Sequence, residues 1–312
     1  MSLEIQDLML QARRLRILPS RRVEDRLSGE YRSVFKGFGI EFDDVREYAY
    51  GDDIRDIDWN VTARLGHPYI KRYHEERELT VILGVDVSGS LSFGVRGRAK
   101  SETAASLAGL LTLTADRYHD KTGLLLFSNR IEKYIPPSRG RRHVMRVLHE
   151  LLTADSRQQG TDIAAALRFL NRVHTRRATV FLVSDFFDDA YENDFQACAR
   201  RHDLIACRLR DVGERELPAA GLLEIADPES GATRSIDTSE PVTRSRLREW
   251  ADAQAQYLEK LCRLHEIDLL EVSNQGDVAD ALRQWFRQRR QRTRVPRSTP
   301  KRASPAIQSS EV

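Results

Sequence analysis

The sequence has few cysteines, no long apolar run and little net charge, and each of these absences excludes a class of protein. The three cysteines, Cys198, Cys207 and Cys262, are scattered without the spacing of metal ligands, so we expect reduced thiols that pack in the interior of a cytosolic protein. No stretch approaches the roughly 20 apolar residues that cross a bilayer, and the charged, amphipathic N-terminus differs from a signal peptide. We therefore expect no transmembrane segment and a cytoplasmic location.

The usual catalytic motifs are also missing. An aspartate-based phosphatase that used Asp86 would need a second carboxylate two residues later, where this chain has Ser88. Neither Ser88 nor Ser90 has the Gly-x-Ser-x-Gly frame of a serine hydrolase, and no phosphate-binding loop or HExxH zinc motif occurs. The eight histidines are expected at the surface. These absences predict a protein that is not an enzyme.

The composition is that of a polar globular protein with a basic C-terminus. Hydrophobic residues make up 40% and charged residues 31%, against typical values of about 45–50% and about 25%. The formal net charge is only +3, yet residues 283–302 contain nine Lys or Arg and no acid. We expect residues 291–312 to form a disordered basic tail that docks on an acidic partner, contacts an anionic surface weakly or serves solubility. The tail lacks interleaved aromatic residues, so no specific nucleic-acid binding is expected.

From residue 80 onward, short β-branched runs alternate with longer amphipathic stretches. This pattern is typical of an α/β fold with an open, mainly parallel sheet and helices on both faces. The predicted strands are residues 80–87, 122–128, 178–185, 203–210 and 267–272. Residues 130–137 end in two prolines, which favours an antiparallel edge strand. We assign residues 80–290 to this domain.

Residues 1–79 are different in kind. An arginine-rich amphipathic segment predicts a helix over about residues 8–18, ending at Pro19. The glycines, aromatics and paired acids that follow predict a loop-rich region with short strands. We do not expect this region to form an independent domain.

Polar side chains occur where two predicted strands end and where one predicted helix begins. Asp86, Ser88 and Ser90 follow the first strand, Thr161 precedes a helix, and Asp185 ends the most apolar strand. In an open α/β sheet the carboxyl ends of the strands share one edge, so these side chains could meet there. All five offer hard oxygen ligands, which favour Mg²⁺, Mn²⁺ or Ca²⁺ over zinc or copper. The simpler alternative is that they only form turns and helix caps.

The five residues match the pattern Asp-x-Ser-x-Ser, distant Thr, distant Asp of the metal-ion-dependent adhesion site, and this part of the chain resembles the von Willebrand factor type A domain. The resemblance implies that Asp86, Ser88, Ser90, Thr161 and Asp185 hold Mg²⁺ (or Mn²⁺ or Ca²⁺). It also implies that an open coordination position captures an acidic residue of a client protein.

A second motif lies in the N-terminal region, within REYAYGDDIRDIDW. Its residues are Arg46, Tyr48, Gly51, Asp52, Asp53, Arg55, Ile57, Asp58 and Trp59, followed by Arg64. The motif resembles the signature of the prokaryotic domain-of-unknown-function family fifty-eight, and the resemblance covers about residues 25–290. Members of that family are typically associated with MoxR-type AAA+ ATPases, which implies such an ATPase as a partner.

The charges of this motif have two interpretations. We favour a buried salt-bridge network, a clasp that holds the N-terminal region on the α/β domain and offers a partner surface, over a catalytic site. The expected function is a non-catalytic, metal-dependent protein-binding module that assembles, remodels or activates protein complexes. The alternatives are a divalent-metal-dependent hydrolase and a metal-free scaffold.

Overall fold

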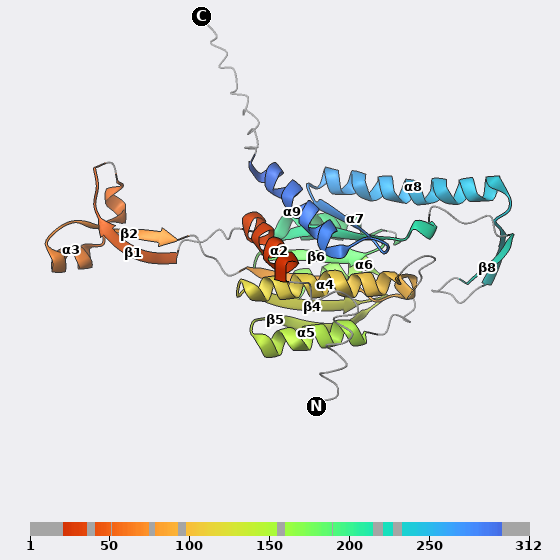
Figure 1. The fold of residues 1–312 in the computed structure, drawn as a ribbon, viewed down its shortest axis with the longest axis horizontal. Coiled ribbons are helices and arrows are strands. Elements are labelled where there is room, and N and C mark those ends of the chain that lie inside the picture. The colour runs from red at the N-terminus through yellow and green to blue at the C-terminus, as the bar shows by residue number, and fades with distance from the viewer. Residues whose placement is uncertain are drawn as a thin grey trace, which may run out of the picture.

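A six-stranded sheet forms the centre of the protein (Figure 1). The computed structural model describes residues 21–35, 41–50, 52–74, 79–92, 98–154, 160–188, 190–214, 221–226 and 233–294. The strand order is β10-β7-β6-β3-β4-β5. The strands are β3 (Thr80–Asp86), β4 (Lys121–Phe127), β5 (Ile131–Ser138), β6 (Thr179–Ser184), β7 (Asp203–Arg210) and β10 (Asp268–Ser273). Only β5 runs antiparallel to its neighbour in this sheet.

The predicted fold class is therefore confirmed, with strand limits that differ by at most one residue at either end. The prediction succeeded because buried parallel strands are continuous apolar runs. In β3, for example, all residues after Thr80 are buried. Alternate side chains enter opposite layers: Val81, Leu83 and Val85 join one core cluster, and Ile82 joins the other.

Helices cover both faces of the sheet (Figure 1). One core cluster contains residues of α2 (Arg21–Val34), α4 (Lys100–Arg117), α5 (Arg141–Thr153) and α9 (Val278–Arg294). The other contains residues of α6 (Ile163–Val173), α7 (Glu192–Arg201) and α8 (Pro241–Leu264). Among the described helices, none is both long and apolar enough to span a membrane.

Helix α2 corrects the expectation that the first 79 residues are loop-rich after residue 19. Gly29 favours a loop in the sequence, but packing overrides this propensity. Leu27, Tyr31 and Phe35 are buried against the core, and the Tyr31 hydroxyl donates to Asp120 Oδ2 at 2.9 Å. The helix predicted over residues 8–18 lies outside the described residues.

The predicted short strands form a separate hairpin, drawn apart from the sheet in Figure 1. We call residues 41–74 the N-terminal lobe. It consists of β1 (Glu41–Glu47), η1 (Ile54–Asp56), α3 (Trp59–Leu65) and β2 (Tyr69–His74), with β1 and β2 antiparallel. A second hairpin, β8 (Leu222–Ala226) and β9 (Thr233–Asp237), precedes α8 and was not predicted.

Two further expectations need correction. Helix α9 continues to Arg294, so the first residues of the predicted disordered tail, 291–294, are helical, and the rest of the tail lies outside the described residues. His202 was expected at the surface but is only 2% exposed. The three cysteines are buried, as predicted.

Candidate functional site

Two of the predicted carboxylates lie close together at the carboxyl edge of the sheet. Asp86 ends β3 and Asp185 follows β6, which is paired with β3. Both residues are buried, with 1% and 2% exposure. The Ser184 hydroxyl, on β6, donates to Asp86 Oδ2 at 2.7 Å and joins the ends of the two strands.

The two predicted serines complete the loop after β3. The Ser88 amide donates to Asp86 Oδ1 at 2.8 Å, and this bond forms a tight turn. The turn continues into η2 (Gly89–Ser92), where the Ser88 and Ser90 hydroxyl oxygens lie 3.0 Å apart. Ser88 is buried and Ser90 half-buried, and the Ser88 side chain also hydrogen-bonds to Asp86.

Thr161 is brought to the same edge by backbone bonds between loops. The Val87 amide donates to the Phe127 carbonyl (2.8 Å), and the Asp162 amide donates to the Ser128 carbonyl (2.9 Å). The Ile163 amide then donates to Asp188 Oδ2 (2.8 Å), three residues beyond Asp185. These bonds link the loops after β3, β4 and β6 with the start of α6. The structure therefore gathers all five predicted residues at one edge, with Thr161 half-buried.

The backbone is strained directly beside Asp185. Phe186 has a φ of +60°, a left-handed conformation that a bulky side chain rarely adopts, and its ring is buried. Its amide donates to the Ser184 hydroxyl at 3.1 Å. Strain of this kind costs of order 1–3 kcal/mol and concentrates at functional sites. Phe186 therefore forms a strained turn one residue beyond Asp185.

The sequence analysis did not predict a positively charged side chain at this site. Lys100, at the start of α4, places its ammonium 2.6 Å from Asp185 Oδ2 and 2.7 Å from Glu214 Oε1, and its side chain is 3% exposed. Glu214 ends η3 (Val212–Glu214), after β7. One signal was available: a lysine in the first turn of a helix opposes the helix dipole, so a nearby acid was to be expected.

Burial opposes ionisation of the carboxyl groups at this site. Burial, together with the charge of Asp185, raises the pKa of Asp86 to about 7. Burial lowers the pKa of Lys100, but the two carboxylates outweigh it and hold the pKa above its ordinary value. Burial also raises the pKa of Glu214 despite the ammonium beside it. The Lys100 ammonium thus pairs with two of these carboxyl groups, those of Asp185 and Glu214.

The donor set fits a hard cation. Ligands at about 2.0–2.1 Å in adjacent positions of an octahedral shell lie about 3 Å apart, and the Ser88 and Ser90 oxygens, which share a hydrogen bond, already lie 3.0 Å apart. The described residues contain no group of three or more His, Cys, Asp or Glu side chains that could hold a metal. A metal at this edge would therefore depend on hydroxyl ligands, and the donor chemistry matches Mg²⁺, Mn²⁺ or Ca²⁺ rather than zinc.

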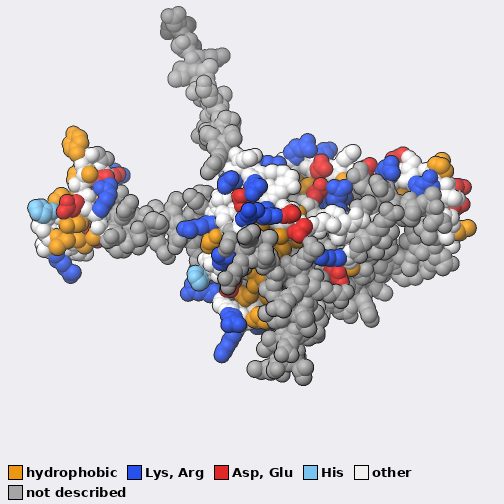
Figure 2. Space-filling model, in the orientation of Figure 1, with side chains coloured by type: hydrophobic (Ala, Val, Ile, Leu, Met, Phe, Trp, Pro, Cys, Tyr) orange, Lys and Arg blue, Asp and Glu red, His pale blue; other side chains and the backbone are white. Residues whose placement is uncertain are grey.

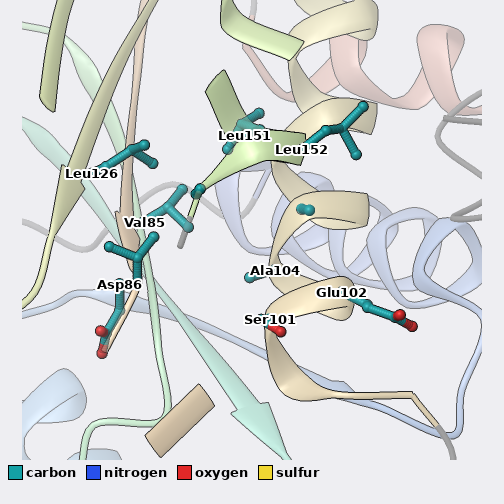
Figure 3. Close-up of a pocket in the computed structure, with 11 residues that line it drawn as sticks. Val85, Asp86, Ser101, Glu102, Ala104, Leu126, Leu151 and Leu152 are labelled. Atoms are coloured by element: carbon teal, nitrogen blue, oxygen red, sulfur yellow. The ribbon is translucent and has the colours of Figure 1, made fainter. Parts of the chain in front are cut away.

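A small cavity borders the site between β3, β4 and helices α4 and α5 (Figure 3). Its volume is about 110 Å³, below the roughly 300–1,000 Å³ of typical small-molecule pockets. Val85, Leu126, Leu151 and Leu152 give it an apolar wall, and the Asp86 carboxylate points away from Leu151 and Leu152 in Figure 3. The cavity therefore does not resemble a substrate pocket centred on the carboxylates.

The motif residues of the N-terminal lobe form local turns and caps. Arg46 binds both carboxylate oxygens of Asp52 at 2.9 and 2.7 Å and lowers its pKa. Asp53 caps η1 through the Arg55 amide, and Asp58 caps α3. The Arg46 side chain is 43% exposed, so the expected buried salt-bridge network is wrong: the pair stabilises a surface turn. Gly51 lies outside the described residues.

The remaining motif residues are at least partly accessible. Tyr48 is half-buried, whereas Arg55, Trp59 and Arg64 are exposed. Figure 2 shows hydrophobic side chains gathered on the lobe. The large exposed apolar residues there are Tyr50, Ile54, Trp59 and Leu65. The lobe therefore exposes four large apolar side chains to solvent.

Comparisons with known proteins place the chain among uncharacterised relatives. The family model described as "Protein of unknown function DUF58" matches residues 44–257. Uncharacterised proteins of Mycobacterium tuberculosis and Mycobacterium bovis are each 32% identical over 230 residues, which is 72% of this chain and 73% of each relative.

Similarity to solved structures is weaker. The conserved hypothetical protein BatB from Bacteroides thetaiotaomicron aligns with a TM-score of 0.44 and 16% identity, over 68% of this chain and 99% of that protein. The pilus adhesin SpaC from Lactobacillus rhamnosus GG aligns with a TM-score of 0.38 and 11% identity, over 70% of this chain and 31% of that protein. These TM-scores add nothing to the topology established above.

Proposed function

Because the chain belongs to the DUF58 family of proteins of unknown function, we propose its function from the site: a non-catalytic module that binds a divalent cation and, through it, an acidic residue of another protein. The observation that carries this proposal is the convergence of Asp86, Ser88, Ser90, the Thr161 loop and Asp185 at one strained edge of the sheet. These five residues would hold the ion.

The chemistry required of the ion is simple. When bound, Mg²⁺, Mn²⁺ or Ca²⁺ would neutralise the carboxylates and offer an open coordination position to an outside oxygen. The chain's own residues orient this edge. Ser184 and the Ser88 amide fix Asp86, and Lys100 fixes Asp185. The resemblance to the metal-ion-dependent adhesion site of von Willebrand factor type A domains supports the same assignment.

The partner is proposed on separate grounds. A MoxR-type AAA+ ATPase is implied by the family resemblance, and a client protein would supply the acidic residue. The exposed apolar side chains of the N-terminal lobe give the module a second surface, distinct from the metal edge. Together the two surfaces suit a protein that brings an ATPase and a client together.

One observation favours a metal-free scaffold as the second candidate. The Lys100 ammonium already contacts Asp185 and Glu214, so part of the negative charge is compensated without metal. A scaffold would bind its partners equally well in the presence of a chelator.

Metal binding is the first test. The purified full-length chain is titrated with Mg²⁺, Mn²⁺ and Ca²⁺ while its melting temperature is measured. A ligand at 100 times its Kd stabilises by about 2.7 kcal/mol, which for a domain of this size is roughly 5–10 °C. Asp86→Asn and Ser90→Ala should abolish the shift, and Asp252→Asn on α8 is the matched control. No shift in the wild type would refute the metal site.

Partner binding is the second test. Wild type and Asp86→Asn are used as bait in lysate of the source organism, each with Mg²⁺ and with EDTA, and the captured proteins are identified by mass spectrometry. Retention of an AAA+ ATPase or a client only by wild type in Mg²⁺ supports the module. Equal capture in all four conditions supports the scaffold, and a hydrolytic activity lost in Asp86→Asn would identify an enzyme instead.

A further inference from the structure

Helix α8 carries two stripes, of which only one faces the protein's own core. The first consists of Ala251, Leu258, Leu261 and Cys262, all buried. The second consists of exposed residues separated by four, three, four, three and four positions: Arg246, Trp250, Ala253, Tyr257, Lys260 and Leu264. Trp250, Tyr257 and Leu264 are 50%, 43% and 65% exposed. We call this second stripe the α8 seam.

Alternating spacings of three and four place residues on one face of a helix and are the pattern by which two helices pack together. The seam extends over 18 residue steps, from Arg246 to Leu264, or about 27 Å at 1.5 Å per residue. Helix α8 lies at the upper edge of the molecule in Figure 1, beyond α7 and away from the sheet. A helix-pairing pattern therefore lies on an outer helix.

The aromatic members of the seam are already held in place. The Trp250 ring stacks on Phe187 with centroids 5.1 Å apart, and the Tyr257 hydroxyl donates to Glu192 Oε2 at 3.5 Å. Each ring keeps an exposed part. Side chains that are fixed before binding lose little entropy when a partner covers them.

We infer that the α8 seam binds the α8 seam of a second copy of this chain, with the two helices antiparallel across a two-fold axis near Ala255. In this register Trp250 faces the partner's Lys260, and Ala253 faces the partner's Tyr257. Arg246 faces the partner's Leu264. The Lys260 ammonium is attracted to the Trp250 indole. The small Ala253 leaves room for the Tyr257 ring, and the aliphatic part of Arg246 covers Leu264.

The antiparallel direction follows from the charges. In a parallel pair in register, each Arg246 and each Lys260 would face its own copy, and like charges would repel. The antiparallel pair separates them and closes into a dimer because both copies use the same surface. The seam itself contains no Asp or Glu. Within the seam, the two chains would therefore contact each other mainly through apolar and aromatic side chains.

Residues beside the seam add a complementarity of charge between the two chains. Glu249, Gln256 and Arg263 flank it on one side at spacings of seven. In the antiparallel register Glu249 lies opposite the partner's Arg263, and symmetry repeats this pair. Gln256 lies opposite the partner's Gln256. The Arg263 side chain is 82% exposed and reaches Glu259 only at 3.9 Å, so it is accessible to a partner.

The first experiment measures mass and proximity in the full-length chain. Sedimentation is followed from about 1 to about 200 μM, the range expected for a modest interface, and Gln256→Cys is treated with a short bis-maleimide. The native thiols are buried, and burial raises the pKa of Cys198 and of Cys262 to about 12, so only the new thiol should react. We expect a mass that doubles with concentration and a cross-linked dimer.

Arg248→Cys is the matched control, because residue 248 is exposed on the same helix. In the antiparallel register it lies far from residue 248 of the second chain. It should give no cross-linked dimer. A wild type that stays monomeric at about 200 μM, or equal cross-linking of both variants, overturns the inference.

The second experiment tests the register at Glu249 and Arg263, which are both exposed and whose contacts with Ser245 and Glu259 lie within α8. Glu249→Arg and Arg263→Glu should each weaken the dimer by roughly tenfold, because each reversal replaces two attractive pairs by two repulsive ones. The double variant should recover wild-type affinity, and the two single variants should associate when mixed. Failure of the double variant to recover would refute the antiparallel register.

Discussion

Removal of the Lys100 ammonium should destabilise the protein more than any loss of a surface ion pair. Its side chain is 3% exposed, that of Asp185 is 1% exposed and that of Glu214 is 14% exposed. In Lys100→Met the apolar stem is kept and the charge is lost. Asp185 and Glu214 then remain as neighbouring carboxylates without their cation.

The expected magnitude follows from this burial. Removal of one partner from a buried ion pair costs about 3–5 kcal/mol, because the remaining charge is left without compensation. For a domain of this size, this loss corresponds to a fall in melting temperature of roughly 6–20 °C. The double variant Lys100→Met/Glu214→Gln should recover part of the loss, since one of the two uncompensated charges is removed with the ammonium.

The assay is urea denaturation at neutral pH in a chelating buffer, with Lys133→Met as the matched control. Lys133 lies 2.7 Å from Glu150, a distance close to those in the Lys100 pairs, but its side chain is 43% exposed. Exposed pairs contribute about 0–1 kcal/mol, so the control should unfold almost like wild type. Equal losses in the two variants, or no recovery in the double variant, would refute the reasoning.

Other predictions concern helix α2, the sheet edge and pH. Gly29→Ala should stabilise by roughly 0.5–1 kcal/mol, because an added Cβ in α2 meets nothing within 4 Å. Gly123→Ala should destabilise by roughly 1–3 kcal/mol, because the Cβ would lie 2.9 Å from Pro137 on β5; urea midpoints check both. Burial lowers the pKa of His202 from 6.5 to about 4. The unfolded chain therefore binds the proton first, and about 3 kcal/mol of stability is lost as the pH falls from 6.5 to 4. His202→Asn should reduce this loss, whereas the exposed His149→Asn should not, as melting curves at several pH values would show.

The central sheet could be predicted from the sequence because its signal is local. Each parallel strand is one apolar run, and β5 carries its two prolines at the edge of the sheet. The positions of Asp86, Ser88 and Asp185 at strand ends follow from the same runs, and the topology then brings them together. No knowledge of long-range contacts was needed beyond the rule that parallel strands share a carboxyl edge.

The remaining features depend on contacts between distant residues. Helix α2 is held by Tyr31 and its bond to Asp120, 89 residues away, and its own sequence contains a glycine that disfavours a helix. The charges of the N-terminal motif suggested a buried network, yet Arg46 and Asp52 pair at the surface. Sequence spacing predicts that opposite charges meet, but it does not tell whether a core covers them.

Lys100 connects the buried ion pairs of this sheet edge with the proposed metal site. Its ammonium contacts Asp185 and Glu214, whereas the Asp86 carboxylate accepts hydrogen bonds from the Ser184 hydroxyl and from the amide and side chain of Ser88, which are neutral donors. Burial and the charge of Asp185 raise the pKa of Asp86 to about 7, so the Asp86 carboxyl group, beside the Ser88 hydroxyl, is the one that a bound divalent cation would return to its ionised form. A divalent cation bound there should then stabilise Lys100→Met by more than it stabilises wild type, because it would also relieve the unpaired Asp185. Melting temperatures of both proteins with and without Mg²⁺ measure this difference. An equal shift in the two proteins would show that Lys100 does not affect metal binding.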